Sequence, residues 1–282
     1  MHAMIITAYQ DYESLKAVAK ALSARALCYI HVDAKCGIDD AMTAELTAME
    51  NVRAIRRYKV NWGSVYHLHA LIDLCRMALE DSRVTHLHLI SAQDFPTMSA
   101  DEFERFFEGD DRIHMQSLVT KDYPELAHRY EHFHFMHLMN YRDMSERAQN
   151  WVGRIDRWQD MLHIRRKVSV PYKGLVWASL PRAAAEHAVN DKKNKALLRK
   201  LKYTYIPEEF YLQNAFAGTA FEKKITGSEL RFSIWDEPHR GTPALLDEHD
   251  LARVDASGCV LCRKVKTGST LYQTLEDRWL GR

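Results

Sequence analysis

The stretch Pro207-Glu208-Glu209 places two adjacent carboxylates directly after a proline, in a sequence typical of a helix start. Proline is favoured at the first helical position, where its missing N–H is not needed. A carboxylate in the first turn is stabilised by the positive end of the helix dipole. One of the two acids could therefore be held ionised in a fixed place, as a general base must be. The alternative is ordinary helix-start chemistry with no catalytic role.

Positive side chains in the C-terminal part could neutralise a diphosphate. The sequence has no glycine-rich phosphate loop, and no Asp-x-Asp of the kind that holds a cation in metal-dependent sugar transferases follows a predicted strand. The candidates are therefore Arg240 and Lys264, since arginine offers a bidentate fork and lysine a point charge. Taken singly, each is more often a surface charge.

Histidines are concentrated between residues 128 and 137, and histidine is a common zinc ligand. They are His128, His132, His134 and His137. Their spacing gives at most two ligands on one face, with no clear third partner. Cys259 and Cys262 form a lone CxxC, whose side chains would point to opposite faces of a strand. We therefore expect neither a metal ion nor another cofactor.

These residues are set among strand-like and helix-like segments that alternate over the first hundred residues. Short apolar runs predict strands at 4–8, 27–32, 52–57 and 86–90. Apolar residues at helical spacing predict helices at 13–23, 38–49 and 63–80. Such alternation is typical of a mainly parallel sheet with helices on its faces, where ligands collect at the carboxyl ends of the strands.

The remainder of the chain is less regular. The segment 121–167 is rich in His, Arg, Tyr and Trp and lacks clear periodicity, so we interpret it as a long insertion over or beside the sheet. Further strands are predicted at 174–180, 231–235 and 259–265, and a helix at 181–189. No flexible linker or internal repeat is visible, which favours a single domain over residues 1–282.

The overall composition argues against several classes of protein. Thirty-nine basic and 38 acidic residues give a net charge of +1, which does not suit a surface devoted to nucleic acid. No window approaches the ~20 apolar residues of a membrane span, and the first residues lack the positive stretch of a signal peptide. Five cysteines, an odd set, suit a reducing compartment better than a disulfide framework. We therefore expect a soluble cytoplasmic protein.

Seven short motifs follow one another along nearly the whole chain, from about residue 4 to 266. They are Ile30-His31-Val32-Asp33-Ala34-Lys35, Trp62-Gly63-Ser64, Leu89-Ile90-Ser91-Ala92-Gln93-Asp94-Phe95-Pro96, Arg129-Tyr130-Glu131, Tyr172-Lys173-Gly174-Leu175-Val176-Trp177, Pro207-Glu208-Glu209 and Arg263-Lys264-Val265. The series resembles the core-2/I-branching β-1,6-N-acetylglucosaminyltransferase family, which also contains the peptide O-xylosyltransferases. The resemblance implies a GT-A-type α/β fold, with a nucleotide-binding part at about 1–100 and an acceptor-side and catalytic part at about 101–282.

The resemblance also implies an inverting transfer from a UDP-sugar without a metal ion, in agreement with the missing Asp-x-Asp. By position, the family's catalytic base falls on Glu209, and Glu208 is a capping or orienting neighbour. The family's diphosphate-binding lysine matches Lys264, and its arginine partner falls near Arg240. The other assignments are nucleotide contacts by His31, Val32, Asp33, Trp62 and Ser64, and acceptor-side contacts by Asp94, Arg129, Trp177, Glu208 and Trp235.

The expected activity is transfer of N-acetylglucosamine, as first choice of sugar, to a hydroxyl of a glycan acceptor. The expected partners are thus a UDP-sugar and a glycan, without nucleic acid, and association with a membrane surface is left open. The chain looks like a bacterial-type relative, for example in polysaccharide biosynthesis, because it lacks the membrane anchor and disulfides of the secreted animal enzymes. Three alternatives stay open: a UDP-xylose-dependent transferase, a non-catalytic glycan-binding module, and a metal-dependent hydrolase that uses the histidine-rich segment.

Overall fold

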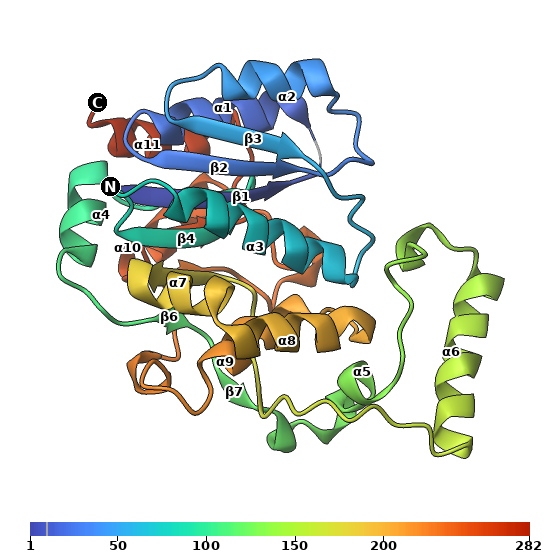
Figure 1. The fold of residues 1–282 in the computed structure, drawn as a ribbon. Coiled ribbons are helices and arrows are strands. Elements are labelled where there is room, and N and C mark those ends of the chain that lie inside the picture. Colours follow the sequence, from blue (N-terminus) through green and yellow to red (C-terminus); the bar gives the residue numbers. More distant parts are fainter. Residues whose placement is uncertain (10) are drawn as a thin grey trace.

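A six-stranded, mainly parallel sheet forms the centre of the protein in the computed structural model, which describes residues 1–9 and 11–282 (Figure 1). The strand order is β3-β2-β1-β4-β9-β6. The first four strands of this order are parallel, whereas β9 runs antiparallel to both of its neighbours. The bounds are β1 (His2–Ala8), β2 (Leu27–Val32), β3 (Val52–Arg56), β4 (His86–Ser91), β6 (His114–Met115) and β9 (Ala178–Pro181).

Helices cover both faces of this sheet, so its central strands are buried on both sides, as expected of a parallel sheet. Met4 and Ile6 of β1 face one core, and Ala3 and Ile5 face the other. The first core also contains residues of α1 (Tyr12–Ser23), α2 (Asp40–Thr47), α4 (Ala100–Phe107), α10 (Leu251–Ala256) and α11 (Thr270–Leu280). The second contains residues of α3 (Val65–Leu79), α7 (Arg182–Asn190), α8 (Lys192–Lys200) and α9 (Glu208–Phe216).

Two small sheets join segments that lie far apart in the sequence. The first has the order β10 (Arg231–Phe232), β11 (Leu261–Arg263) and β5 (Asp94–Pro96), and the second pairs β7 (Leu118–Val119) with β8 (Tyr172–Lys173). In the first sheet, β11 and β5 are antiparallel, and Arg263 is opposite Asp94. This pairing places a late basic residue beside the end of β4.

The segment 121–167 contains α5 (His128–Glu131) and α6 (Glu146–Met161), joined by irregular chain with short 3₁₀ turns. Figure 1 shows α6 at the periphery of the molecule, away from the central sheet. The interpretation of this segment as an insertion beside the sheet agrees with that position.

The predicted α/β fold with a mainly parallel central sheet is confirmed. The strand expected at 174–180 begins later, at Ala178, and lies antiparallel to β4. The helix expected to start at Pro207 starts at Glu208, so the proline occupies the cap position. No helix in the described part of the chain is long and apolar enough to cross a membrane.

Candidate active site

The starts of α3 and α9 are held together by the two motifs that precede them. The Ile206 N–H donates to the Gly63 carbonyl at 3.0 Å. Gly63 has a φ of +76°, and a Cβ there would lie 2.6 Å from the Tyr205 ring, so this contact needs glycine. The rings of Trp62 and Tyr205 meet edge to face with centroids 5.3 Å apart, and the Ser64 hydroxyl caps α3. Two predicted site motifs therefore meet where β3 leads into α3.

Glu208 and Glu209 have different surroundings. The Glu208 side chain is 10% exposed; its Oε1 lies 2.9 Å from Nδ1 of His67, whose Nε2 lies 3.3 Å from Oγ1 of Thr7 in β1. The Glu209 side chain is 25% exposed, and its Oε2 accepts a 2.9 Å hydrogen bond from Arg129. No donor among the described residues hydrogen-bonds Glu209 Oε1. Glu208 is tied to the sheet, whereas Glu209 keeps one oxygen for a reacting group.

Arg129 is fixed by the chain that leads into α9. The buried guanidinium donates to the carbonyl oxygens of Tyr205 and Ile206, each at 3.3 Å, and lies 5.0 Å from the centroid of the Phe210 ring. The Tyr205 N–H in turn donates to the Arg129 carbonyl at 2.8 Å. Arg129 was predicted to contact the acceptor; in this geometry it orients the Glu209 carboxylate.

Asp94 lies at the centre of a buried charge cluster. Its side chain is 0% exposed, and Oδ2 accepts from the backbone N–H and hydroxyl of Ser91 at 2.6 and 2.5 Å. Arg263 donates to the same oxygen at 2.9 Å, and Nε of Arg231 forms an ion pair with Oδ1 at 2.7 Å. The two guanidinium groups lie 4.4 and 4.6 Å from the centroid of the Trp177 ring. Asp94 therefore fixes two arginines against Trp177 and has no exposed oxygen for a substrate.

Lys264 lies among positive side chains, and no carboxylate of the described residues forms an ion pair with Lys264 or Arg142. Its ammonium donates to the Thr242 carbonyl at 3.3 Å. Burial and the positive charges of Arg263 and Arg142 lower the pKa of Lys264. Arg142 lies 4.6 Å from the centroid of the Trp62 ring, close to the motif before α3. Mutually repelling cations of this kind are stabilised by a bound anion, so the predicted anion contact of Lys264 fits its surroundings.

Arg240 has a different environment from Lys264. Its guanidinium contacts three carboxylates, those of Glu237 at 2.8 Å, Asp247 at 3.2 Å and Asp250, and it donates to the Leu245 carbonyl at 2.9 Å. Asp250 and Glu237 raise the pKa of Arg240. A diphosphate would have to displace acidic partners from this side chain. The role predicted for Arg240 stays a prediction, and its contacts do not favour it.

The residues at the end of β2 are internal. Val32 is buried, and His31 accepts a 3.1 Å hydrogen bond from the Tyr58 N–H through Nε2. Burial lowers the pKa of His31 to about 4, so the ring is neutral at neutral pH. Oδ1 of Asp33 accepts from the Val60 N–H at 3.1 Å. These side chains shape the chain that leads to α3, and their direct contact with a nucleotide stays a prediction.

Trp235 lies on the surface with its indole N–H bonded to the Ser233 hydroxyl at 2.9 Å, so an acceptor contact there also stays a prediction. The sequence reasoning missed His67, Arg142 and Arg231. His67 could have been found, because it lies three residues after Ser64 on the first turn of a predicted helix that faces the sheet edge. Arg142 and Arg231 carry no comparable signal.

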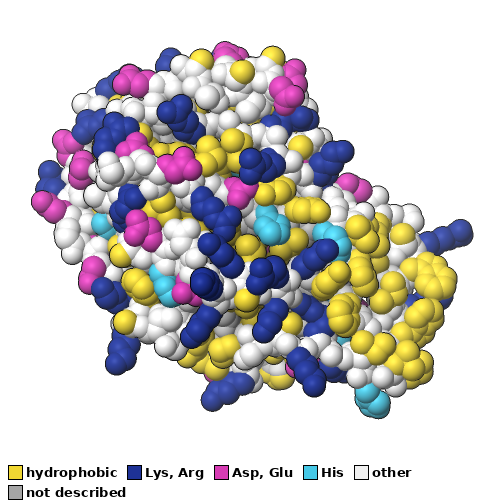
Figure 2. Space-filling model, in the orientation of Figure 1, with side chains coloured by type: hydrophobic (Ala, Val, Ile, Leu, Met, Phe, Trp, Pro, Cys, Tyr) yellow, Lys and Arg dark blue, Asp and Glu magenta, His cyan; other side chains and the backbone are white. Residues whose placement is uncertain are grey.

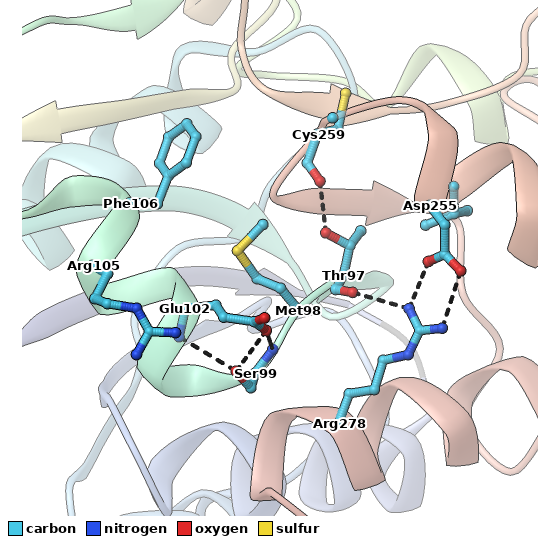
Figure 3. A pocket seen from close by; sticks show the side chains of 11 residues that line it. Thr97, Met98, Ser99, Glu102, Arg105, Phe106, Asp255, Cys259 and Arg278 are labelled. Atoms are coloured by element: carbon cyan, nitrogen blue, oxygen red, sulfur yellow. Dashed lines mark hydrogen bonds and ion pairs between the residues drawn. The ribbon is translucent and has the colours of Figure 1, made fainter.

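A pocket of about 750 Å³ lies elsewhere, between α4, α10 and α11 (Figure 3). Several of its polar groups bind one another: Asp255 accepts two hydrogen bonds from Arg278 at 2.6 and 3.1 Å, and Ser99 and Glu102 form a capping box. None of the predicted site residues lines this pocket. The size of this pocket is therefore no reason to prefer it as the active site over the start of α9.

A carboxylate held at a helix start near a group of cations is an arrangement suited to group transfer with an anionic leaving group. Residues 3–255 match the family model described as "Branch: Core-2/I-Branching enzyme". Because this match covers most of the chain, the protein belongs to the core-2/I-branching enzyme family, and it is a glycosyltransferase. The resemblance read from the seven motifs is confirmed.

Solved structures give weaker likenesses. The galactosyltransferase LgtC, in complex with donor and acceptor sugar analogs, is 11% identical over 98% of this chain and 83% of its own, with a TM-score of 0.40. The bifunctional glycosyltransferase WbbM is 11% identical over 99% of this chain and 52% of its own, also with a TM-score of 0.40. 4-Diphosphocytidyl-2C-methyl-D-erythritol synthase is 10% identical over 76% of this chain and 94% of its own, with a TM-score of 0.31. The comparison with curated proteins finds no matching relative. Scores this low carry no argument about function.

Proposed function

We propose that the protein transfers a sugar, with N-acetylglucosamine as first choice, from a UDP-sugar to a hydroxyl of a glycan acceptor, with inversion and without a metal ion in the transfer step. The single observation that carries this proposal is the Glu209 carboxylate. It is held by Arg129 at 2.9 Å through one oxygen, while the side chain is one quarter exposed. A general base needs this combination of a fixed position and an accessible oxygen.

In the proposed step, the acceptor oxygen attacks the anomeric carbon as Glu209 takes its proton. The bond between that carbon and the UDP oxygen breaks, and UDP leaves with the bonding electron pair. Lys264 and Arg142 then balance the charge that grows on the diphosphate, as preorganised cations do in other transfer sites. Arg142 replaces Arg240 in this role, because Arg240 is already bound by acidic side chains.

The acceptor side is proposed to include Trp177 and Trp235. Trp177 is held by two arginines on its ring, and Trp235 is exposed. Aromatic rings offer the apolar faces of sugars a flat contact surface, in the way that they bind other ligands. The acceptor itself, a cell-surface polysaccharide in our proposal, is defined only as a glycan. All five cysteines are unpaired, which agrees with the proposed cytoplasmic location.

We expect UDP to raise the melting temperature of the protein equally in excess EDTA and in added Mn²⁺. Lys264→Ala should remove most of this shift, whereas Arg240→Ala should lower the melting temperature but keep the shift, because Arg240 serves the fold. Thermal unfolding with UDP, UDP-N-acetylglucosamine and UDP-xylose measures donor preference in the same experiment. A UDP-induced shift that needs Mn²⁺ would contradict the metal-independent part of the proposal, and a stronger shift with UDP-xylose would favour the xylosyltransferase.

We also propose that α6 binds the surface of an anionic membrane, where lipid-linked glycans are built. Four large apolar residues form a stripe at helical spacing and are exposed: Trp151, Ile155, Trp158 and Leu162. Basic residues flank the stripe, and the Arg154 guanidinium lies 5.0 Å from the centroid of the Trp151 ring. Figure 2 shows hydrophobic side chains gathered on this part of the surface. Aromatic residues on one side and arginines beside them are typical of helices that lie in a membrane interface.

Replacing Trp151 and Trp158 together by alanine should weaken binding to vesicles of phosphatidylcholine and phosphatidylglycerol by at least roughly 100-fold, since two large apolar side chains contribute on the order of 3 kcal/mol or more together when buried. Co-sedimentation measures this, with Leu245→Ala, an exposed residue outside the stripe, as control. Equal binding to pure phosphatidylcholine would remove the electrostatic part of the proposal. Self-association without vesicle binding would mean that a second copy covers the stripe.

A further inference from the structure

Three side chains from the segment 121–167 converge on one point. Nδ1 of His132 lies 3.5 Å from Oδ1 of Asp156, and Nδ1 of His134 lies 3.8 Å from the same oxygen. The three ligand atoms all lie within 4.8 Å of one another. Asp156 belongs to α6, whereas the two histidines follow α5. Two separate parts of the segment thus present imidazole nitrogens and a carboxylate to the same place.

The other ring nitrogen of each histidine is already used. Nε2 of His132 lies 3.1 Å from Oδ1 of Asp160, and Nε2 of His134 lies 2.8 Å from the carbonyl of His128. Since a carboxylate and a carbonyl only accept, both Nε2 atoms carry the hydrogen, and both Nδ1 atoms of neutral rings carry a lone pair. Metal-binding histidines typically show this pattern, in which an outer acceptor fixes the ring and its tautomer.

The cluster is unsatisfied without a further positive charge. His132 is 3% exposed, and its Nδ1 has no hydrogen-bond partner among the described residues. A lone pair on a neutral ring that faces a carboxylate oxygen at 3.5 or 3.8 Å repels that oxygen. Buried polar atoms without a hydrogen-bond partner are also rare in proteins. A bound cation would satisfy all three ligand atoms together.

We propose that His132, His134 and Asp156 bind one divalent transition-metal ion, with Zn²⁺ as the ion that suits this ligand set best. Zinc takes imidazole and carboxylate ligands at ~2.0–2.2 Å with tetrahedral geometry, which places ligand atoms about 3.3–3.5 Å apart. The two histidine–aspartate separations of 3.5 and 3.8 Å are close to this range, and the two histidine nitrogens, within 4.8 Å of each other, would have to lie at a similar separation around the ion. Because Asp156 is 29% exposed, water can complete the coordination.

The ion would hold α6 against the chain that carries Arg129. The backbone N–H of His134 donates to the Tyr203 carbonyl at 2.9 Å. The centroid of the His134 ring lies 5.6 Å from that of the Tyr205 ring, and the Tyr205 carbonyl accepts a hydrogen bond from Arg129. The proposed role is therefore structural, and the ion takes no part in the transfer step. The inference stands independently of the proposed function, because it rests on ligand geometry alone.

The test uses tag-free full-length protein, treated with chelator, desalted and titrated with ZnCl₂ by calorimetry. We expect one zinc ion per chain and an increase in melting temperature on binding. Asp156→Ala should lower the zinc affinity by at least about 100-fold, since losing even outer partners of a ligand costs 10–100-fold. Asp156 is the chosen ligand because it is partly exposed on a helix, so this variant should fold. His128→Ala, from the same segment but without a side chain in the cluster, should bind zinc like the unchanged protein.

Cobalt(II) adds a second readout, because tetrahedral coordination gives visible absorption that Asp156→Ala should lose. Two results would overturn the proposal. One is the absence of stoichiometric zinc binding by the unchanged protein, which would leave a histidine–aspartate cluster without a metal. The other is an Asp156→Ala variant that binds zinc as tightly as the unchanged chain does. Neither result would affect UDP binding, which is measured separately.

Discussion

Glu209→Gln is expected to lower the turnover number of sugar transfer by roughly 10²–10⁴-fold, the usual contribution of a general base. The amide cannot take the proton of the attacking hydroxyl. Its carbonyl oxygen can still accept the hydrogen bond from Arg129, so the side chain should stay in place and the fold should be unchanged. UDP binding should also be unchanged, because it depends on the cations around Lys264 rather than on Glu209.

Glu208→Gln is the matched comparison, because it changes the neighbouring acid in the same turn in the same way. Its carboxylate pairs with His67 and is 10% exposed, so we expect lower stability with a smaller loss of transfer. Both variants are compared with UDP-N-acetylglucosamine and a panel of glycan acceptors, at equal concentrations of folded protein. A Glu209→Gln enzyme with normal turnover, or a greater loss in Glu208→Gln, would reverse the roles assigned to the two acids.

Asp94→Asn is expected to lower the free energy of unfolding by about 3–5 kcal/mol, the cost of removing one partner from a buried ion pair. The change removes the negative charge without leaving a cavity. The Arg231 side chain, which is 2% exposed, then keeps a positive charge without its carboxylate. Burial already lowers the pKa of Arg231, and the negative charge of Asp94 is the main influence that opposes this effect.

Urea unfolding followed by circular dichroism measures this difference. The control is Asp101→Asn in α4, which removes an exposed ion pair between Asp101 and Arg25. Exposed pairs contribute about 0–1 kcal/mol, so the control should be nearly as stable as the unchanged protein. A loss for Asp94→Asn no larger than that of the control would mean that Asp94 does not hold the arginines, and would restore a direct role in substrate binding.

The elements with strong periodicity could be predicted from the sequence, and those that depend on distant contacts could not. Helix 63–80 and strand 27–32 lie within two residues of the observed α3 and β2, because each has a complete apolar face. The strands β10 and β11 lie within the strands expected at 231–235 and 259–265 but are only two and three residues long, and the three-residue β5 was not predicted because it is too short for a periodic signal. Their pairing nevertheless decides that Arg263 meets Asp94 across 169 positions.

The candidate site shows the same limit. Glu209 could be found because proline and two acids form a local signal for a helix start. Arg142 lies in a segment without periodicity, so nothing in the sequence places it over Trp62. The sequence analysis found no third ligand to accompany the histidines. The structure places Asp156 beside them, and this residue lies 22 positions after His134 in a separate helix. For Arg240, the acidic residues Asp247 and Asp250 are visible nearby in the sequence. The sequence does not show, however, that both contact the Arg240 guanidinium.

A crystal structure of the protein with UDP tests the central claim most directly. We predict that phosphate oxygens will lie within hydrogen-bond distance of Lys264, with Arg142 nearby and no metal ion between protein and diphosphate. The open oxygen of Glu209 should face the side of the diphosphate where the sugar would be attached. UDP bound away from Lys264, or a diphosphate held through a metal ion, would contradict the account.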